Sequence, residues 1–420
     1  MDKEKKIYVY ADFRPFHEDF VGTIYVSQTR GKEFYSFEYD EKWLEKGNLV
    51  LDPDLQLYKG RQYINDDKKI FGVFADSCPD RWGQRLMKRR EELRAKKAEE
   101  KPRKLLDSDY LLGVYDEARM GGLRFKTDPE GEFLSNDREF ATPPWTSLRE
   151  LEQASIAFEN DESGLDEKWL KQLLAPGSSL GGARPKASVM APDGSLWIAK
   201  FPSRHDDFNS GAWEMVVHDL AIMCGLNVPE AKVEKFSKLG TTFLVKRFDR
   251  MESQRIHFSS AMTMLGKQDG ANATDGSSYL EIVSFLKANG VTPKKDIQEL
   301  WKRIAFSMAV SNTDDHFRNH GFILKGRGWE LSPMYDVNPD IYGEYLSLNV
   351  DEDNSSIDFD LAIEAAPFYE MSKTQAQKNI ADMKKIVGDN WRTLAGKYGI
   401  SRGEIERMRP AFQECDTSNY

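Results

Sequence analysis

The most informative segment of the chain is SNTDDHFRNHGF (311–322). It follows the apolar stretch WKRIAFSMAV (301–310) and precedes SPMYDVNP (332–339). Its first ten residues hold two acids, two asparagines and two histidines. Polar groups next to an apolar stretch cost free energy unless they have partners or a function. We therefore expect the segment to form a polar loop that carries chemistry.

Metal-dependent hydrolysis is one chemistry that fits these residues, because carboxylate oxygens and imidazole nitrogens are common metal ligands. The ligands available to such a site are Asp314, Asp315, His316 and His320. His316 and His320 are four residues apart, which would place both on one face of a helix. A loop at this position removes that geometry, so the hydrolase interpretation is the weaker one.

Phosphoryl transfer is the second chemistry. In protein kinases a catalytic-loop Asp accepts the substrate hydroxyl proton, an Asn further along the loop holds Mg²⁺, and a later Asp completes the metal site. Asp314 and Asn319 have the Asp-x-x-x-x-Asn spacing, and Asp336 follows the apolar segment GFIL (321–324). This interpretation uses more of the residues and also predicts their order.

A kinase also needs a phosphate-binding loop, a lysine and an acid that braces the lysine. The segment GSSLGGARPK (177–186) is rich in glycine, although it matches neither a Walker A nor a G-x-G-x-x-G motif. Lys200 ends the predicted strand SLWIAK, and Glu214 is the candidate brace, with Glu230 a weaker one. FLVKRFDR (243–250) is the candidate hinge that would contact adenine.

Each of these features has an ordinary structural explanation when it is taken alone. Paired glycines are common in turns, a lysine at a strand end is usually a surface residue, and His316 and His320 could be hydrogen-bonded loop residues. Asp249 could pair with Arg247 or Arg250 as a structural clasp. The occurrence of all the candidates in the kinase order favours phosphoryl transfer.

The composition is that of an acidic globular protein. The chain has 420 residues, of which 40% are hydrophobic and 30% are charged, and its formal net charge is −10. This length predicts roughly two or three domains. The acidity argues against nucleic-acid binding by bulk charge, because phosphate neutralisation needs a basic surface.

The cysteine and hydropathy patterns predict a cytoplasmic protein with no membrane contact. Cys78, Cys224 and Cys415 form no C-x-x-C pair, which argues against a disulfide scaffold and a cysteine-based zinc finger. The opening MDKEKKIYVY has no apolar stretch long enough for a signal peptide. No run approaches the roughly 20 apolar residues of a membrane span.

The chain is predicted to change from strands to helices along its length. Alternation in 33–39 places Tyr35, Phe37 and Tyr39 on one face, which we expect to be buried. A long charged helix is expected to begin at Asp80 and to end at Lys101-Pro102. Its basic residues, with those just past the proline, form either a solvated face, which we favour, or a docking patch for an acidic partner. Further strands are expected at 7–10, 21–26, 231–236 and 241–247, and a hairpin at 186–201. Helices are expected at 147–159, 165–174 and 211–224, and mainly helices from about 259.

Together the motifs resemble those of the HipA-like serine/threonine kinases, the toxin components of bacterial type II toxin–antitoxin modules. The resemblance rests on SSLGGARPK, AKF, VKRFDR, SNTDDHFRNHGF and SPMYDVNP, with support from SCPDRWGQRL (77–86), MGGLRF (120–125) and CGLNVPEAKV (224–233). It implies an α+β, two-lobed fold like that of protein kinases. The implied parts are a β-rich N-terminal subdomain (1–130), a kinase N-lobe with the glycine-rich loop (131–247) and an α-helical C-lobe (248–420).

The resemblance also implies ATP and Mg²⁺ as cofactors and gives roles to matching residues. Asp314 resembles the catalytic base, and Asn319 and Asp336 resemble the Mg²⁺ ligands. Lys200 resembles the lysine that binds phosphates. The implied nucleotide-binding residues are Gly181, Gly182, Ala183 and Lys186 in the loop, Lys200, the hinge residues Lys246, Arg247 and Phe248, and His316, Asn319, Tyr335 and Asp336.

Members of this family carry a serine in the glycine-rich loop that is autophosphorylated, which ejects the loop and switches the kinase off. Ser179 stands at that position, with Ser178 beside it as a second acceptor. A phosphoserine adds about −1.5 to −2 charges, which cannot share a site with the phosphates of ATP. The resemblance therefore implies autoinhibition at Ser179.

The sequence departs from the family at two places. Lys246 stands where the best-known members have an acid, and segment 255–260 lacks an acidic pair that some members have. Both departures spare the proton-transfer and Mg²⁺ positions and concern the substrate. Known members phosphorylate aminoacyl-tRNA synthetases and are neutralised by a helix-turn-helix DNA-binding antitoxin, so the resemblance implies the same partners, with DNA contacted only through the antitoxin.

Other functions remain open at this point. The main alternative is a non-catalytic, kinase-shaped component of an antitoxin or repressor complex, which the intact set of Asp, Asn and Lys residues disfavours. A small-molecule or lipid kinase is a weaker alternative, and it would place phosphate on a metabolite rather than on protein.

Overall fold

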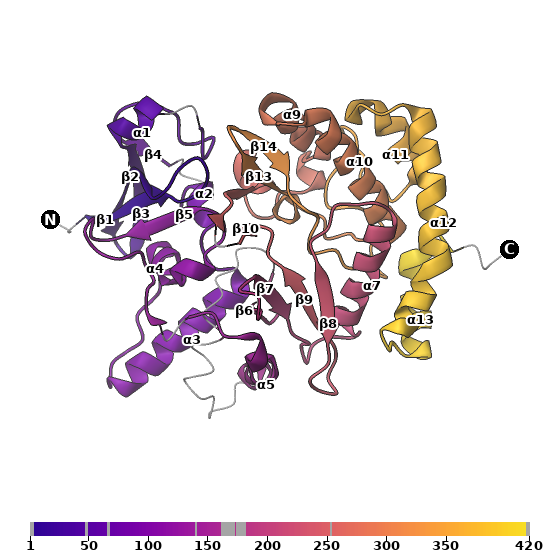
Figure 1. The fold of residues 1–420 in the computed structure, drawn as a ribbon, viewed down its shortest axis with the longest axis horizontal. Helices are drawn as coiled ribbons and strands as arrows, with labels where there is room; N and C mark the ends of the chain where they lie inside the picture. The colour runs from indigo at the N-terminus through magenta and orange to yellow at the C-terminus, as the bar shows by residue number, and fades with distance from the viewer. Residues whose placement is uncertain are drawn as a thin grey trace. The chain divides into compact units, whose positions relative to one another are not determined.

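The structure is a computed structural model that describes residues 4–46, 49–64, 68–138, 141–160, 173, 182–252 and 254–416. The chain divides into two compact units, and Figure 1 labels most of their helices and strands. The N-terminal unit comprises Met1–Ala199 and Arg247–Ser259, and the C-terminal unit comprises Lys200–Lys246 and Ser260–Tyr420. Helices and strands occur in both units, so the predicted α+β class is confirmed. The domain limits at 130 and 247 stay predictions.

A five-stranded antiparallel sheet organises the N-terminal unit. Its strands, in the order β4-β3-β2-β1-β5, are β1 (Lys5–Ala11), β2 (Asp19–Thr29), β3 (Lys32–Tyr39), β4 (Gln62–Tyr63) and β5 (Leu123–Lys126). Along β3, the side chains of Tyr35, Phe37 and Tyr39 are 2%, 0% and 3% exposed. Phe34, on the opposite face, is 55% exposed. The predicted strands and their buried aromatic face are therefore confirmed.

The N-terminal unit also contains the predicted charged helix. Its helices are α1 (Glu41–Lys46), α2 (Gly72–Ala75), α3 (Arg81–Lys97), α4 (Asp107–Gly113) and α5 (Leu148–Glu159), with 3₁₀ turns η1 (Asp116–Ala118) and η3 (Trp145–Ser147). Helix α3 ends at Lys97, earlier than predicted. Glu99 adopts a left-handed φ of 56°, and Glu100 N–H donates to Ala95 C=O across 2.8 Å, which closes the helix.

Two expectations for the region before residue 200 can be compared with the structure. Helix α5 confirms the helix at 147–159, whereas the helix at 165–174 lies outside the described residues except for 173. Strands β6 (Lys186–Met190) and β7 (Leu196–Lys200) confirm the hairpin, with Gly194 at a φ of 80° in its turn. The short strands β10 (Arg250–Met251), β11 (Gln254–Arg255) and β12 (Phe258–Ser260) follow later in the chain.

The C-terminal unit is mainly helical, as the sequence predicts. Its helices are α7 (Ser210–Met223), α8 (Ala261–Met264), α9 (Tyr279–Asn289), α10 (Pro293–Ala309), α11 (Phe359–Ala365), α12 (Lys373–Lys397) and α13 (Arg402–Met408), with 3₁₀ turns η4 (Ala273–Asp275), η5 (Phe317–Asn319), η6 (Ala366–Tyr369) and η7 (Arg409–Phe412). Its two antiparallel hairpins join β8 (Ala231–Glu234) to β9 (Thr242–Lys246) and β13 (Gly321–Lys325) to β14 (Gly328–Leu331). Within the described ranges, every helix is too short or too polar to span a bilayer.

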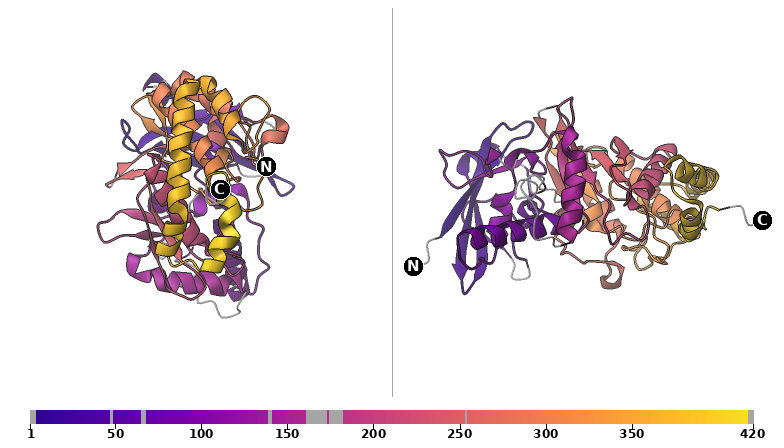
Figure 2. Two further views of the ribbon diagram at one scale, coloured as in Figure 1. Left: turned by 90° about the vertical axis from the view of Figure 1, so that its right-hand side faces the viewer. Right: turned by 90° about the horizontal axis from the view of Figure 1, so that it is seen from below.

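An aromatic cluster fixes the helices that lead to the candidate site. Helix α12 packs against α7 and α10, with α13 beside it (Figure 2). Trp213 of α7 and Trp391 of α12 are buried, and the Trp391 ring stacks on Phe412 with 4.6 Å between the centroids. This core holds α7, which carries Glu214, and α10, which leads into the polar segment 311–320.

Candidate functional site

Helix α10 delivers the chain to the polar segment 311–320. The helix ends at Ala309, and Ser311 then adopts a left-handed φ of 48°. Asn312 N–H donates to Ser307 C=O across 2.8 Å, which completes the turn. Left-handed backbone is uncommon outside glycine and costs free energy, so the surrounding packing must hold it. The segment continues as a loop with the 3₁₀ turn η5, as the sequence predicts.

Lys200 contacts two acidic side chains in the C-terminal unit. Its Nζ donates to Glu214 Oε1 across 2.5 Å and to Asp336 Oδ1 across 2.6 Å. Burial lowers the pKa of Lys200, but Asp336 and Glu214 outweigh this effect and hold the pKa above the ordinary lysine value. Lys200 is therefore charged. Glu214 is the acid that braces it, whereas Glu230 lies 3.4 Å from Lys246.

Asp336 combines this ion pair with strained backbone. Its φ is 57°, in the left-handed region. Asn338 Nδ2 lies 3.5 Å from Asp336 Oδ1, and Asn338 N–H donates to Asn312 Oδ1 across 3.2 Å. These contacts connect Asp336 to the start of the polar segment. Strain of this kind clusters at functional sites.

Asp314 is the exposed acid of the segment. Its side chain is 87% exposed, and its Oδ1 lies 3.7 Å from His316 Nε2. Neighbouring protein atoms displace some of the water around the carboxylate and raise the pKa of Asp314, His316 opposes the rise, and the carboxylate of Asp336 adds to it. Water reaches the group and screens much of this effect. A solvent-accessible acid with a raised pKa suits proton transfer.

Asn319 and Tyr335 are tied to the same loop. Asn319 is buried, and its Nδ2 donates to Asp314 C=O across 2.6 Å. This contact uses the amide nitrogen and leaves Asn319 Oδ1 as an oxygen ligand. Tyr335 OH donates to Arg318 C=O across 2.8 Å, so the residue that precedes Asp336 is held against the segment.

A buried polar cluster supports the loop. Asp315 accepts a hydrogen bond from Tyr279 OH across 2.9 Å, and its Oδ1 lies 2.9 Å from His320 Nε2. Burial alone would raise the pKa of Asp315, but His320 and the Tyr279 hydrogen bond hold the pKa below the ordinary value. The sequence did not reveal this supporting role of Asp315, because two adjacent aspartates look alike in sequence. Only their burial, which depends on the fold, distinguishes Asp315 from Asp314.

The proposed ligands of a metal hydrolase are not grouped. Among the residues that the structure describes, no three His, Cys, Asp or Glu side chains form a cluster that could hold a metal ion. Asp314 is exposed, whereas Asp315 and His320 pair with each other in the interior. This absence does not concern an Mg²⁺ site made by Asn319 and Asp336, because the asparagine would contribute an amide oxygen and asparagine is not among those four residue types.

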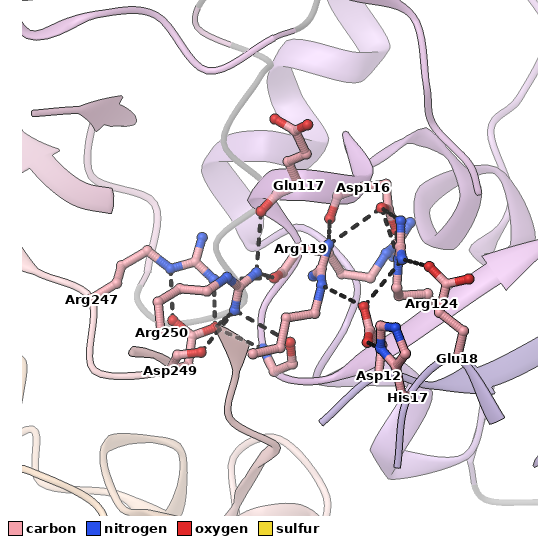
Figure 3. A network of polar contacts seen from close by, with 12 residues as sticks. Asp12, His17, Glu18, Asp116, Glu117, Arg119, Arg124, Arg247, Asp249 and Arg250 are labelled. Atoms are coloured by element: carbon pink, nitrogen blue, oxygen red, sulfur yellow. Dashed lines mark hydrogen bonds and ion pairs between the residues drawn. The ribbon is translucent and has the colours of Figure 1, made fainter. Parts of the chain in front are cut away.

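The candidate hinge contains the Asp249 clasp, which lies in the N-terminal unit (Figure 3). The buried Arg247 guanidinium donates to both carboxylate oxygens of Asp249, across 2.9 and 2.6 Å. Its remaining donors reach the carbonyl groups of Ala118 and Arg119. Arg250 also pairs with Asp249, at 2.6 Å. The clasp expected for Asp249 is therefore present and involves both arginines.

The other hinge residues lie beside this clasp in the sequence. Lys246 ends β9, and its backbone N–H donates to Glu230 C=O across 2.8 Å. The ring centroids of Phe248 and Phe258 are 5.8 Å apart. The adenine contacts expected of residues 246 to 248 stay a prediction.

The glycine-rich loop is described only from residue 182 onward. Gly182 and Ala183 are exposed, whereas Lys186 is buried against Asp80, a residue that the sequence did not single out. Gly181, Ser178 and Ser179 lie outside the described residues. Their nucleotide-binding and phosphorylation roles stay predictions.

Comparison with known proteins matches both parts of the chain to family models. Residues 178–391 match the HipA-like C-terminal domain, and residues 16–107 match the HipA N-terminal domain. A putative kinase, Y4dM, from Sinorhizobium fredii is 24% identical over 288 residues, which are 64% of this chain and 63% of the relative. The serine/threonine-protein kinase toxin HipA of Shewanella oneidensis is 26% identical over 210 residues, which are 42% of this chain and 48% of the relative.

A solved structure has the same fold over nearly the whole chain. It is a chain of the HipA, HipB and operator DNA complex of Shewanella oneidensis MR-1, with a TM-score of 0.67 and 16% sequence identity. The similarity covers 97% of this chain and 96% of that chain. The alignments with Y4dM and with the Shewanella toxin span less than two thirds of those relatives' lengths. Because the C-terminal family model spans half of the sequence, the chain belongs to the family of HipA-like proteins.

Proposed function

We propose that the chain is an ATP- and Mg²⁺-dependent protein serine/threonine kinase that acts as the toxin of a toxin–antitoxin module. The contact of Lys200 with Glu214 and Asp336 is the observation that carries this proposal. Protein kinases combine such a lysine and glutamate pair with a metal-binding Asp. Asp314 and Asn319 belong to the same compact unit.

The side chains present fit ATP and Mg²⁺. Asn319 Oδ1 and the Asp336 carboxylate are oxygen ligands, which Mg²⁺ prefers. Lys200 offers a positive charge for phosphate oxygens, and its contact with Glu214 limits the positions that the ammonium can take. When bound, ATP would supply the phosphoryl group, and Mg²⁺ would neutralise the negative charge on the phosphates.

Asp314 would accept the hydroxyl proton of the acceptor serine or threonine. Its carboxylate is exposed, so a protein substrate can reach it. A carboxylate within reach of the acceptor hydroxyl is the group that general-base catalysis needs.

The substitution Asp314→Ala should lower phosphate transfer by at least about 10²-fold, because a positioned base contributes 10²–10⁴-fold. It should spare ATP binding, since the base acts on the acceptor hydroxyl. The assay incubates purified protein with Mg²⁺ and labelled ATP, alone and with lysate proteins. Asp382→Ala is a matched control, because Asp382 is also an exposed acid, paired with Lys378 on α12.

Two results would contradict the proposal. A well-folded wild-type protein that labels neither itself nor any lysate protein would exclude kinase activity under these conditions. Normal transfer by the Asp314→Ala variant would remove Asp314 from the role of base. We expect the Asp382→Ala variant to keep its phosphate-transfer activity and the Asp314→Ala variant to lose it.

The acceptor residues belong to the same proposal. We infer autophosphorylation at Ser179, with Ser178 as the alternative, and a translation component such as an aminoacyl-tRNA synthetase as the substrate in the cytoplasm. Phosphopeptide mapping of the wild type against Asp314→Ala should give a labelled loop peptide only in the wild type. Label on a metabolite instead of a protein would favour a small-molecule kinase.

A helix-turn-helix antitoxin is the partner that we infer. The solved structure with the same fold contains HipA together with HipB and operator DNA. This chain should bind DNA only through such an antitoxin, since its net charge is −10. DNA binding by the isolated chain in a gel-shift assay would contradict this inference.

A non-catalytic component of an antitoxin or repressor complex is the alternative. Such a protein would bind its partner without turnover of ATP. The intact Lys200, Asp314 and Asp336 set supports the catalytic proposal, and measured ATP turnover separates the two.

A further inference from the structure

Lys186 ends the glycine-rich segment, yet its ammonium group is enclosed. Its Nζ donates to Asp80 Oδ2 across 2.6 Å, and the side chains of Lys186 and Asp80 are each 3% exposed. The same Nζ donates to Gly182 C=O across 3.2 Å. One buried charge therefore connects the described start of the loop to Asp80. All three residues belong to the N-terminal unit.

The first turn of helix α3 contacts both the ammonium group and the backbone carbonyl group of Lys186. Asp80 is the N-cap of α3, and its Oδ1 accepts a hydrogen bond from Gly83 N–H across 2.9 Å. Asp80 thus uses one carboxylate oxygen for the helix and the other for Lys186. The buried Trp82 donates its Nε1–H to Lys186 C=O across 3.0 Å. The side chain and the backbone of Lys186 are both fixed by residues 80–82.

The charges of this pair decide what Lys186 can do. A lysine that contacts the phosphates of ATP must direct its ammonium to them. If Lys186 did so, the buried Asp80 carboxylate would lose the ammonium group that donates to its Oδ2, and breaking a buried ion pair is unfavourable. Lys200 differs, because one of its two partners, Asp336, is 24% exposed and is itself a candidate metal ligand.

We propose that Lys186 is a positioning residue, which holds Gly182 and so fixes the end of the glycine-rich loop through its ion pair with Asp80. This proposal rests on the proposed function, because it assumes that the loop binds phosphates. It assigns a role to the PDRW segment (79–82), which kinase chemistry leaves unexplained. It is an alternative to the expectation that Lys186 binds ATP directly, which stays a prediction.

The two roles predict opposite results for Asp80→Asn. If Lys186 only positions the loop, loss of the Asp80 charge frees Gly182 and weakens ATP binding. If Lys186 contacts the phosphates, loss of Asp80 releases the ammonium and strengthens ATP binding or leaves it unchanged. Lys186→Met weakens binding in both cases, so Asp80→Asn is the decisive variant.

The experiment measures the dissociation constants of MgATP and of adenosine for the wild type, Asp80→Asn, Lys186→Met and the double variant. Each single substitution should weaken MgATP binding by about tenfold, the size expected when a hydrogen bond to a charged group is lost. The double variant should bind no more weakly than either single variant, because the two residues act as one unit. Adenosine, which has no phosphates, should bind all four proteins equally.

Asp116→Asn is the matched control for folding. Asp116 is another buried acid of the N-terminal unit, and it pairs with Arg124 at 2.6 Å. All proteins are compared at a temperature at which circular dichroism shows them folded. Asp116→Asn should keep the MgATP affinity of the wild type. A loss of affinity equal to that of Asp80→Asn would overturn the proposal, because the effect would then be one of general destabilisation.

Hydrogen exchange gives a second measurement that needs no nucleotide. Backbone amides of residues 182–190 should exchange faster in Asp80→Asn and Lys186→Met, and at the wild-type rate in Asp116→Asn. Unchanged exchange in both pair variants, or MgATP binding by Asp80→Asn as tight as that of the wild type, would overturn the positioning role. A wild type that binds no MgATP would instead overturn the proposed function, and the exchange rates would then still decide whether the tether exists.

Discussion

At the scale of single residues, Asp249 organises two arginines around one carboxylate. It is fully buried and accepts hydrogen bonds from Arg247, Arg250 and the backbone N–H of Gly121 (Figure 3). Burial alone would raise the pKa of Asp249, but the two guanidinium groups outweigh it and hold the pKa well below the ordinary value. The clasp therefore fixes the end of the candidate hinge to the loop before β5.

Asp249→Asn should lower the free energy of unfolding by about 3–5 kcal/mol at neutral pH, because it leaves buried guanidinium groups without a countercharge. The folded pKa lies below the unfolded one, so the stabilisation is complete above about pH 3.9 and is lost as the pH falls through the folded value. Urea unfolding should therefore show a smaller difference between wild type and variant in acid than at neutral pH.

Asp12→Asn is the control for this prediction. Asp12 belongs to the same polar network and lies 3.1 Å from Arg124, but its side chain is 21% exposed. Its loss should cost less than the loss of Asp249, because water reaches Asp12 and because Arg124 keeps Glu18 and Asp116 as partners. Equal losses in the free energy of unfolding for Asp249→Asn and Asp12→Asn would contradict the stabilising role of the clasp. A loss for Asp249→Asn that does not change with pH would contradict it as well.

At the scale of elements, Glu91 fixes the end of helix α3. Its side chain is 8% exposed and accepts hydrogen bonds from Arg94 across 2.8 and 2.9 Å and from Arg103 N–H across 3.0 Å. The hydrogen bonds from Arg94 are the largest cause that lowers the pKa of Glu91 to about 2. Part of the charge of α3 is therefore used within the N-terminal unit, which favours a structural role for the helix over a docking patch.

Glu91→Gln should lower the free energy of unfolding by about 1–3 kcal/mol, because it weakens charge-assisted hydrogen bonds. The loss should be present above about pH 4.3, the ordinary value for Glu, and should fade as the pH falls toward the lowered pKa of about 2. Glu92→Gln is the control, since Glu92 is 53% exposed and lies 3.2 Å from Arg89. Urea unfolding that gives equal losses for both variants would contradict this account.

The approach of helix α7 to strand β9 depends on a glycine. A Cβ atom on Gly211 would lie 2.0 Å from the carbonyl oxygen of Thr241. Gly211→Ala should therefore cost about 1–3 kcal/mol through overpacking, and it should disturb Glu214 on the same helix. Thermal unfolding that shows no loss would contradict this close approach.

Gly396→Ala in α12 is the matched control for Gly211→Ala. In the described part of the chain, no atom other than those of the neighbouring residues and of the helix's own backbone lies within 4 Å of the Cβ position of Gly396. The same substitution should therefore raise the free energy of unfolding by about 0.5–1 kcal/mol, because alanine is the better helix former. Opposite signs for the two substitutions are the expected outcome.

At the scale of the whole molecule, bound nucleotide should stabilise the chain. A ligand present at 100 times its dissociation constant adds about 2.7 kcal/mol to the free energy of unfolding. The rise in melting temperature with MgATP should mostly vanish with EDTA, because Asn319 and Asp336 would act through Mg²⁺. Differential scanning calorimetry checks this, and a rise that is identical with and without Mg²⁺ would remove the two residues from the metal site.

Much of the fold and the order of the candidate site could be predicted from the sequence. The aromatic alternation of β3 and the Asp-Gly turn before β7 are local patterns, and local patterns depend on neighbours within a few residues. The end of α3 was predicted less well, since the capping contacts of Glu99 and Glu100 rather than Pro102 closed the helix. The exposure of Asp314 and the burial of Asp315 could not be predicted, because two adjacent acids have the same local sequence pattern.

The sequence by itself determined the α+β class and the succession of Lys200, Asp314, Asn319 and Asp336, because composition, periodicity and spacing are properties of the chain. Only the tertiary structure decided which groups meet. It selected Glu214 over Glu230 as the partner of Lys200, and it paired Lys186 with Asp80, which lies 106 residues away. These choices depend on burial and on long-range packing, which bring distant residues together and exclude the water that would otherwise satisfy their charges.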